Sequence, residues 1–216
     1  KTRIESDLIG AREIPAEALY GVQTLRGIEN FSISKFRLSE YPLFIKGLAI
    51  TKMAAAMANF ELGLLTVEQK DAIIAACGEI LDGKHHDQFP VDMIQGGAGT
   101  TTNMNANEVI ANRALELMGH ERGEYQYCSP NDHVNCSQST NDAYPTAIHI
   151  GMYFKHLQLL PHLEELIASF RKKGEEFSQI IKMGRTQLED AVPMTLGQTF
   201  NGFASILQDE IAHLNE

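Results

Sequence analysis

Long apolar runs are missing from this sequence of 216 residues. No segment approaches the roughly 18 to 20 uninterrupted apolar residues of a membrane span, and the opening KTRIESDLIG lacks the apolar region of a secretory signal. Neither a membrane partner nor export is therefore expected, and a cytoplasmic location is the expectation. With 44% hydrophobic residues, the chain can still bury the core of one or two domains.

Cysteine and clustered positive charge are scarce as well. The three cysteines, Cys77, Cys128 and Cys136, are odd in number and show no Cys-x-x-Cys spacing. This argues against a disulfide framework or a zinc knuckle and favours reduced thiols. The formal net charge is −10, and no block rich in Lys and Arg stands out. A nucleic-acid partner is therefore not expected, and local groups would have to hold any anionic ligand.

Helical periodicity covers most of the chain. The first residues differ, because the alternation in TRIESDLIG followed by Gly10 predicts a short β-hairpin. The apolar segment 42–62 predicts a buried helix. Residues 66–69 match a capping box that begins a second helix, and a third helix follows a glycine-rich loop and ends at Gly119.

The strongest pattern lies further along the chain. Between residues 149 and 180, mostly apolar side chains recur at alternating spacings of three and four, which predicts a long helix with an apolar seam. After a gap rich in Gly, Thr and Pro, the pattern resumes at Leu196 and reaches Leu214. Because Leu160 and Ile167 widen the seam, several helices are expected to meet there.

The predicted fold class is therefore mainly α. Residues 1–138 are expected to form a small, mostly helical N-terminal domain with the β-hairpin, and residues 139–216 the truncated start of a helical-bundle domain. Because the sequence begins with Lys1 and stops at Glu216 within an amphipathic pattern, we expect a piece of a longer protein.

Small hydrogen-bond donors gather directly ahead of two predicted helices, as GGAGTTTN at 96–103 and SQSTND at 137–142. A helix N-terminus leaves backbone N–H groups unpaired and favours an anion. Hydroxyl and amide side chains add donors without a cation, and glycine lets the backbone approach a ligand closely. These clusters predict a carboxylate site. Ordinary N-caps and turns are the alternative.

Two common phosphate-binding loops do not fit the first cluster. A Walker A loop needs a lysine after its last glycine, whereas Thr100 follows Gly99. A dinucleotide fingerprint would need a glycine where Thr102 stands. Adjacent His85 and His86 cannot share a helix face as zinc ligands, so no metal site is predicted.

A third polar segment, KMGRTQLEDAVPMTLGQ at 182–198, links the two predicted bundle helices. It carries Arg185, Thr186 and Gln187 where a simple helix hairpin would need fewer residues. The residues alone leave open whether it belongs to the binding site or is only a long connector.

Several of these motifs resemble the fumarase/aspartase superfamily, and within it the aspartate ammonia-lyases. They are RIESDLIGAREIP, QGGAGTTTNMNANEVIANRALELMG, GEYQYCSPNDHVN, SQSTNDAYPTA and KMGRTQLEDAVPMTLGQ. The resemblance begins near Arg3, reaches the last residue and covers about the amino-terminal half of a family subunit. It implies a homotetramer with a shared bundle of long helices, in which loops of three subunits assemble each active site.

The resemblance also implies the reaction, which is the reversible elimination of ammonia from L-aspartate to give fumarate without an organic cofactor. By motif match, six residues bind the substrate. The β-carboxylate is held by Thr100, Ser139 and Thr140, and the amino-group end and α-carboxylate by Asn141, Thr186 and Gln187. The implied base is a serine on a G-S-S-x-x-M-P loop, which these residues do not contain. No catalytic residue is therefore expected in this chain, which alone should be inactive.

Three positions favour ammonia over water as the leaving group. By the resemblance, fumarases have a histidine at the position of Gln187 and another at the position of Ser129. They also have T-G-S-G at the glycine loop, where this chain has GGAG. A class II fumarate hydratase remains the alternative, as does a fragment that is only a non-catalytic assembly unit. One departure is Cys136, where the family often has lysine.

Overall fold

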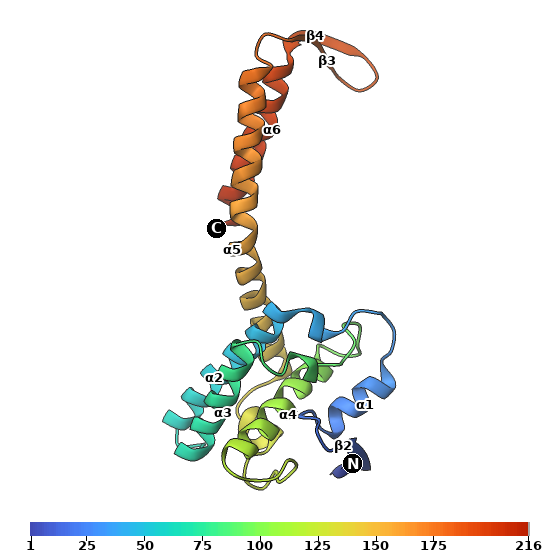
Figure 1. Ribbon diagram of the computed structural model, residues 1–216, viewed down its shortest axis with the longest axis vertical. Helices are drawn as coiled ribbons and strands as arrows, with labels where there is room; N and C mark the ends of the chain where they lie inside the picture. The colour runs from blue at the N-terminus through green and yellow to red at the C-terminus, as the bar shows by residue number, and fades with distance from the viewer. Residues whose placement is uncertain (216) are drawn as a thin grey trace. The chain divides into compact units, whose positions relative to one another are not determined.

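A computed structural model describes residues 1–215 of the chain, which form two compact units. The first unit runs from Lys1 to Met152, and the second begins at Tyr153. Figure 1 shows a helical first unit with a β-hairpin, and a second unit in which two helices are joined by another hairpin. The predicted mainly α fold is confirmed.

The first unit opens with the predicted hairpin. Strand β1 (Thr2–Asp7) pairs antiparallel with strand β2 (Gly10–Pro15). The carboxylate of Asp7 accepts hydrogen bonds from the N–H groups of Ile9 at 2.9 Å and Gly10 at 3.1 Å, which closes the turn. Gly10 has a φ of +135°, a conformation that glycine adopts at little cost.

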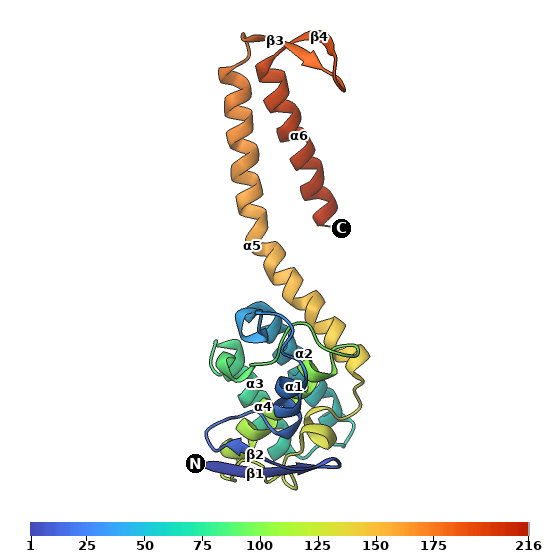
Figure 2. The same ribbon diagram turned by 90° about the vertical axis from the view of Figure 1, so that its right-hand side faces the viewer.

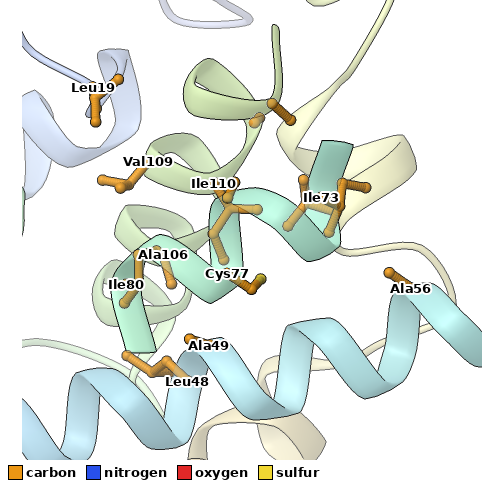
Figure 3. Packing of buried hydrophobic residues seen from close by; sticks show 14 of the residues in the cluster. Leu19, Leu48, Ala49, Ala56, Ile73, Cys77, Ile80, Ala106, Val109 and Ile110 are labelled. Atoms are coloured by element: carbon orange, nitrogen blue, oxygen red, sulfur yellow. The ribbon is translucent and has the colours of Figure 1, made fainter. Parts of the chain in front are cut away.

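The core of the first unit lies between helices. These are α1 (Val22–Asn30), α2 (Pro42–Glu61), α3 (Val67–Leu81) and α4 (Thr100–Leu117), with the short 3₁₀ helices η1 (Leu38–Glu40) and η2 (His86–Gln88). Figure 3 shows Leu48 of α2, Cys77 of α3 and Ile110 of α4 in the buried cluster that joins these helices. The capping box at α3 is confirmed, since Thr66 and Gln69 exchange hydrogen bonds of 3.2 and 3.1 Å. All three cysteines are free.

Helix α2 is the one described helix whose length and composition would allow it to cross a membrane, with 20 residues and a mean hydropathy of 1.3. A core helix of a globular domain meets the same criterion. Here α2 packs against α3 and α4 and carries the fully buried Lys52 near its centre. We therefore interpret α2 as a core helix.

Helix α5 (Thr140–Glu176) begins in the first unit, after the π-helix η3 (Pro130–Val134). Its first turns pack closely on α2: a Cβ atom added at Gly47 would lie 2.2 Å from the carbonyl oxygen of Ala147. The rings of Phe44 and Tyr144 meet edge to face with centroids 5.5 Å apart. Because of this packing, the first unit extends past the boundary expected at residue 138.

The second unit pairs the remainder of α5 with α6 (Leu196–Leu214), as Figure 2 shows. Its small core contains Ile167, Ala204 and Ile211, with Leu160, Leu163, Phe170 and Leu207 packed against them. Leu159 and Leu166, which belong to the predicted seam, stay 44% and 42% exposed in this unit. Two helices therefore cover only part of the apolar surface that the heptad pattern creates.

The connector between α5 and α6 is a β-hairpin, where the sequence predicts only a polar segment. Strand β3 (Ile181–Arg185) pairs antiparallel with strand β4 (Asp190–Thr195), with an irregularity between Met183 and Arg185. Glycine and proline are rare in strands. Because Gly184 and Pro193 interrupt the alternation of apolar and polar residues, the sequence pattern did not predict this hairpin.

Candidate functional site

The glycine-rich loop ends where α4 begins, and its shape depends on glycine. Gly99 is the N-cap of α4 with a φ of +85°, and a Cβ atom there would lie 2.3 Å from the ring of Tyr144. The Gln95 side chain secures the loop by accepting from the N–H of Thr102 at 2.9 Å and donating to the Thr102 hydroxyl at 2.8 Å. Thr100 is exposed as the first residue of α4.

The second cluster lies at the start of α5. The Ser139 hydroxyl oxygen accepts from the N–H of Asn141 at 3.2 Å, and the Ser139 N–H donates to the Asp142 carboxylate at 3.1 Å. Ser139 therefore caps the N-terminus of α5, in line with the alternative that these residues are ordinary N-caps. The cap uses a lone pair of the hydroxyl oxygen, so the hydroxyl hydrogen can still bind a separate acceptor.

The structure brings these two clusters together. Residues of both clusters, Gly97 to Gly99 and Asn141, line a cavity of about 300 Å³, whereas Thr100, Ser139 and Thr140 are not among its lining residues. The lining residues are Met93, Gln95, Gly97, Ala98, Gly99, Asn141, Tyr144 and Pro145. Such a volume suits a small ligand, and the nearby N-termini of two helices favour an anion.

A buried polar network lies beneath the start of α5. The Asn103 amide donates to the hydroxyl oxygen of Thr140 at 3.2 Å, and the Lys52 ammonium donates to the Asn103 side-chain oxygen at 2.7 Å. Lys52 also donates to the side-chain oxygens of Asn135 at 2.8 Å and Gln138 at 3.0 Å. Burial lowers the pKa of Lys52 to about 7. The network thus connects the interior of the first unit to a predicted site residue.

Sequence reasoning missed this network. The signal for Lys52 was a lysine in the middle of an otherwise apolar helix, where an unpaired charge would be costly. Its partners Asn103 and Asn135 lie inside the motifs that carried the resemblance, but their spacing from Lys52 gives no local pattern.

Thr186 and Gln187 belong to the second unit, in the turn between β3 and β4. Both are exposed, and the N–H of Thr186 donates to the carbonyl of Glu189 at 3.0 Å. The predicted donors are therefore divided between the two units. Four of them, Thr100, Ser139, Thr140 and Asn141, lie at the helix starts of the first unit.

A larger cavity of about 620 Å³ lies near the first hairpin and η3. Its charged groups are already satisfied. Arg26 donates to both carboxylate oxygens of Asp7 at 2.8 Å, and the Glu108 carboxylate accepts from the N–H groups of Gly21, Gln23 and Thr24 at 2.8 to 3.0 Å. Among residues 1–215, no group of three His, Cys, Asp or Glu side chains is arranged to hold a metal ion.

The fold and the clustered donors thus characterise a helical protein with a small, anion-favouring cavity. The sequence profile of the Lyase family matches residues 10–216, so the chain belongs to this lyase family. The match confirms the family resemblance found in the motifs.

Known relatives agree with this assignment. The chain is 59% identical over 212 residues to the aspartate ammonia-lyase of Pseudomonas canavaninivorans and 57% identical over 213 residues to that of Escherichia coli strain K12. Each alignment covers 98% of this chain and 45% of the relative. The chain therefore spans about half the length of the curated relatives it matches.

Solved structures give the same answer for the fold. The fumarate lyase:delta crystallin from Brucella melitensis, in a crystal structure with bound cobalt, has a TM-score of 0.94 and 53% identity over 100% of this chain and 47% of its own. A class II fumarase from Schistosoma mansoni has a TM-score of 0.88 and 39% identity over 98% of this chain and 44% of its own.

Proposed function

We propose that the chain forms the amino-terminal part of an aspartate ammonia-lyase subunit, which reversibly eliminates ammonia from L-aspartate to give fumarate. The observation that carries the proposal is the contact between the starts of α4 and α5, which carry the two donor clusters and lie beside one small cavity lined by Gly99 and Asn141. Identities of 57 to 59% to aspartate ammonia-lyases over 98% of the chain support it.

The proposed chemistry explains why hydroxyl groups suit this site. A base removes a proton from the carbon next to the β-carboxylate, and the electron pair left behind makes a doubly charged, enediolate-like species before the C–N bond breaks. Donors that bind this growing charge more strongly than the substrate charge lower the barrier. In the proposal, Thr100, Ser139 and Thr140 are those donors, and losing one costs about 3 to 4 kcal/mol in the barrier.

Further groups complete the proposed site. Asn141, Thr186 and Gln187 bind the amino-group end and the α-carboxylate, and the base is a serine outside this chain. Exposure of Thr186 and Gln187 on the β3–β4 turn supports a role toward another subunit, because they are not engaged in a core.

Exposed apolar side chains support a homotetramer with a shared bundle. They include Tyr153, Leu157, Leu159 and Leu166 on α5 and Phe203, Ile206 and Leu214 on α6. Further helices would bury these side chains, as in other bundles. We place the enzyme in cytoplasmic amino-acid metabolism, acting on a small dicarboxylate without a nucleic-acid or membrane partner, in keeping with a formal charge of −10.

A class II fumarate hydratase is the second candidate, since a fumarase from Schistosoma mansoni shares the fold at 39% identity. Measuring fumarate absorbance with the full-length protein separates the two, using L-aspartate and L-malate as substrates. We expect fumarate from L-aspartate, and none from the present chain alone. A preference for L-malate would support the hydratase, and no product from either substrate would favour the non-catalytic assembly unit.

A further inference from the structure

Asn135 connects three parts of the first unit through one side chain. Its amide oxygen accepts from the Lys52 ammonium on α2 at 2.8 Å and from the Asn103 and Asn107 amides on α4 at 3.1 and 3.2 Å. Its amide nitrogen donates to the carbonyl oxygen of Gln138 at 3.0 Å. The side chain therefore fixes the turn that leads into α5 to two core helices.

This arrangement determines which way the Asn103 amide faces. In its ammonium form, with three hydrogens for three oxygen partners, Lys52 can only donate, so the atom of Asn103 that lies 2.7 Å from it is the oxygen. The other atom is the NH₂ group, which meets the oxygen of Asn135 at 3.1 Å and the hydroxyl oxygen of Thr140 at 3.2 Å. The contact with the Asn135 oxygen requires a donor there, so the amide has one consistent orientation, and the Thr140 hydroxyl accepts from it.

The orientation of Asn103 in turn determines the role of Thr140. A hydroxyl has one hydrogen to donate and two lone pairs that accept. Because Asn103 donates to the Thr140 oxygen, the Thr140 hydrogen is not used in that contact and can bind another acceptor. A reversed Asn103 amide would take that hydrogen and leave Thr140 unable to donate to a carboxylate.

We propose that Asn135 is a positioning residue, which keeps Thr140 a donor to the substrate carboxylate by holding Asn103 and Lys52 in place. The inference rests on the proposed function, because it assigns Thr140 to a substrate carboxylate. It adds a residue that lies beneath the site and acts only through others.

Kinetics of variants of the full-length protein test the positioning role. Asn135→Ala removes the shared acceptor and should lower kcat for L-aspartate more than tenfold. Asn135→Asp keeps the acceptor for Lys52 and Asn103 but loses the donor to the Gln138 carbonyl, and should keep kcat within about threefold of wild type, because the contacts that hold Asn103 remain. Asn112→Ala is the matched control, since Asn112 is a buried asparagine of α4 whose side chain makes three hydrogen bonds, with Leu19, Gly123 and Tyr125. It should lower stability and leave kcat within twofold.

A double-mutant cycle shows whether Asn135 acts through Thr140. Thr140→Val should lower kcat by itself, and adding Asn135→Ala should lower it by less than threefold more. Multiplicative losses, or a kcat of Asn135→Ala within twofold of wild type, would overturn the inference. If Asn135→Ala does not fold, Asn103→Asp replaces it, because an isosteric acceptor should take the Thr140 hydrogen and show the same non-additivity.

Crystal structures of the same variants separate this inference from the proposed function. Asn135→Ala should move the Asn103 side chain away from Thr140, and Asn135→Asp should leave it in place. This result does not depend on the substrate. An unmoved Asn103 in Asn135→Ala would refute the positioning role, whereas a missing lyase activity of the wild type would refute only the proposed function.

Discussion

The side-chain amide of Asn103 donates a hydrogen bond of 3.2 Å to the hydroxyl oxygen of Thr140. This contact joins the first turn of α4 to the first residue of α5, two helix starts that are separated by 37 residues in the sequence. The contact therefore places two helix N-termini, each of which favours an anion, next to each other.

Removing the hydroxyl of Ser139 or Thr100 should show whether it binds the substrate or only caps a helix. We expect Ser139→Ala and Thr100→Ala in the full-length protein to lower turnover of L-aspartate well over tenfold, because each removes a donor to the growing charge. Loss of the Ser139 cap should also cost about 1 kcal/mol of stability. Thr146→Ala, at an exposed position further along α5, is the control. Unchanged kinetics in the first two variants would leave their residues with structural roles only.

A methyl group at Gly99 should lower the stability of the first unit by more than the positive φ angle alone would cost. Gly99 and Gly119 have φ values of +85° and +82°, but a Cβ atom at Gly99 would overlap the Tyr144 ring whereas one at Gly119 meets open space. We expect Gly119→Ala to cost about 1 kcal/mol. Gly99→Ala should cost at least about 1 kcal/mol more through overpacking. Urea unfolding measures both, and equal losses would contradict the close packing of Tyr144.

The buried carboxylate of Glu108 should be hard to replace. It accepts hydrogen bonds from three backbone N–H groups at the start of α1, those of Gly21, Gln23 and Thr24. Glu108→Gln puts an NH₂ group where an acceptor is needed, so we expect a loss of about 2 to 4 kcal/mol in the free energy of unfolding. Glu68→Gln, in the exposed first turn of α3, should change it by less than about 1 kcal/mol. An unchanged free energy of unfolding in Glu108→Gln would contradict the hydrogen bonds of Glu108 to the start of α1.

Acid should weaken the first unit through Glu79. Hydrogen bonds from Arg113 and His85 lower the pKa of Glu79 from its usual 4.5 to about 2. The folded state thus binds fewer protons than the unfolded state between these values, and stability falls as the pH drops from about 4.5 toward 2. Glu79→Gln should reduce the loss between pH 5 and pH 3 by about 1 to 2 kcal/mol.

The control for this experiment is Glu61→Gln, at an exposed position at the end of α2. Chemical unfolding at both pH values gives the comparison. An acid loss in Glu79→Gln equal to that of the wild type would show that the Arg113 pair is not maintained in solution.

Local patterns were enough to predict much of the first unit. The hairpin at residues 2–15 and the box at Thr66 and Gln69 depend on neighbours a few residues away, so the sequence displays their cause directly. The β3–β4 hairpin was missed because Gly184 and Pro193 interrupt its alternation. Pairing along the rest of the two strands outweighs their poor strand propensity.

The candidate site was predictable only in part. The hydroxyl residues at positions 100, 139 and 140 stand next to helix starts, a signal that a sequence displays. The contacts of Lys52 with Asn103, Asn135 and Gln138 join residues 51 to 86 positions apart, and only the tertiary fold brings them together. The orientation of Thr140 therefore could not be derived without the structure.

The most direct test of this account is a crystal structure of the full-length protein with L-aspartate bound. The quantity to measure is the distance from the hydroxyl oxygens of Thr100, Ser139 and Thr140 to the β-carboxylate. The account predicts hydrogen bonds of about 2.5 to 3 Å from all three hydroxyls. A β-carboxylate held by other groups, with Thr100 and Thr140 turned away from it, would contradict the account.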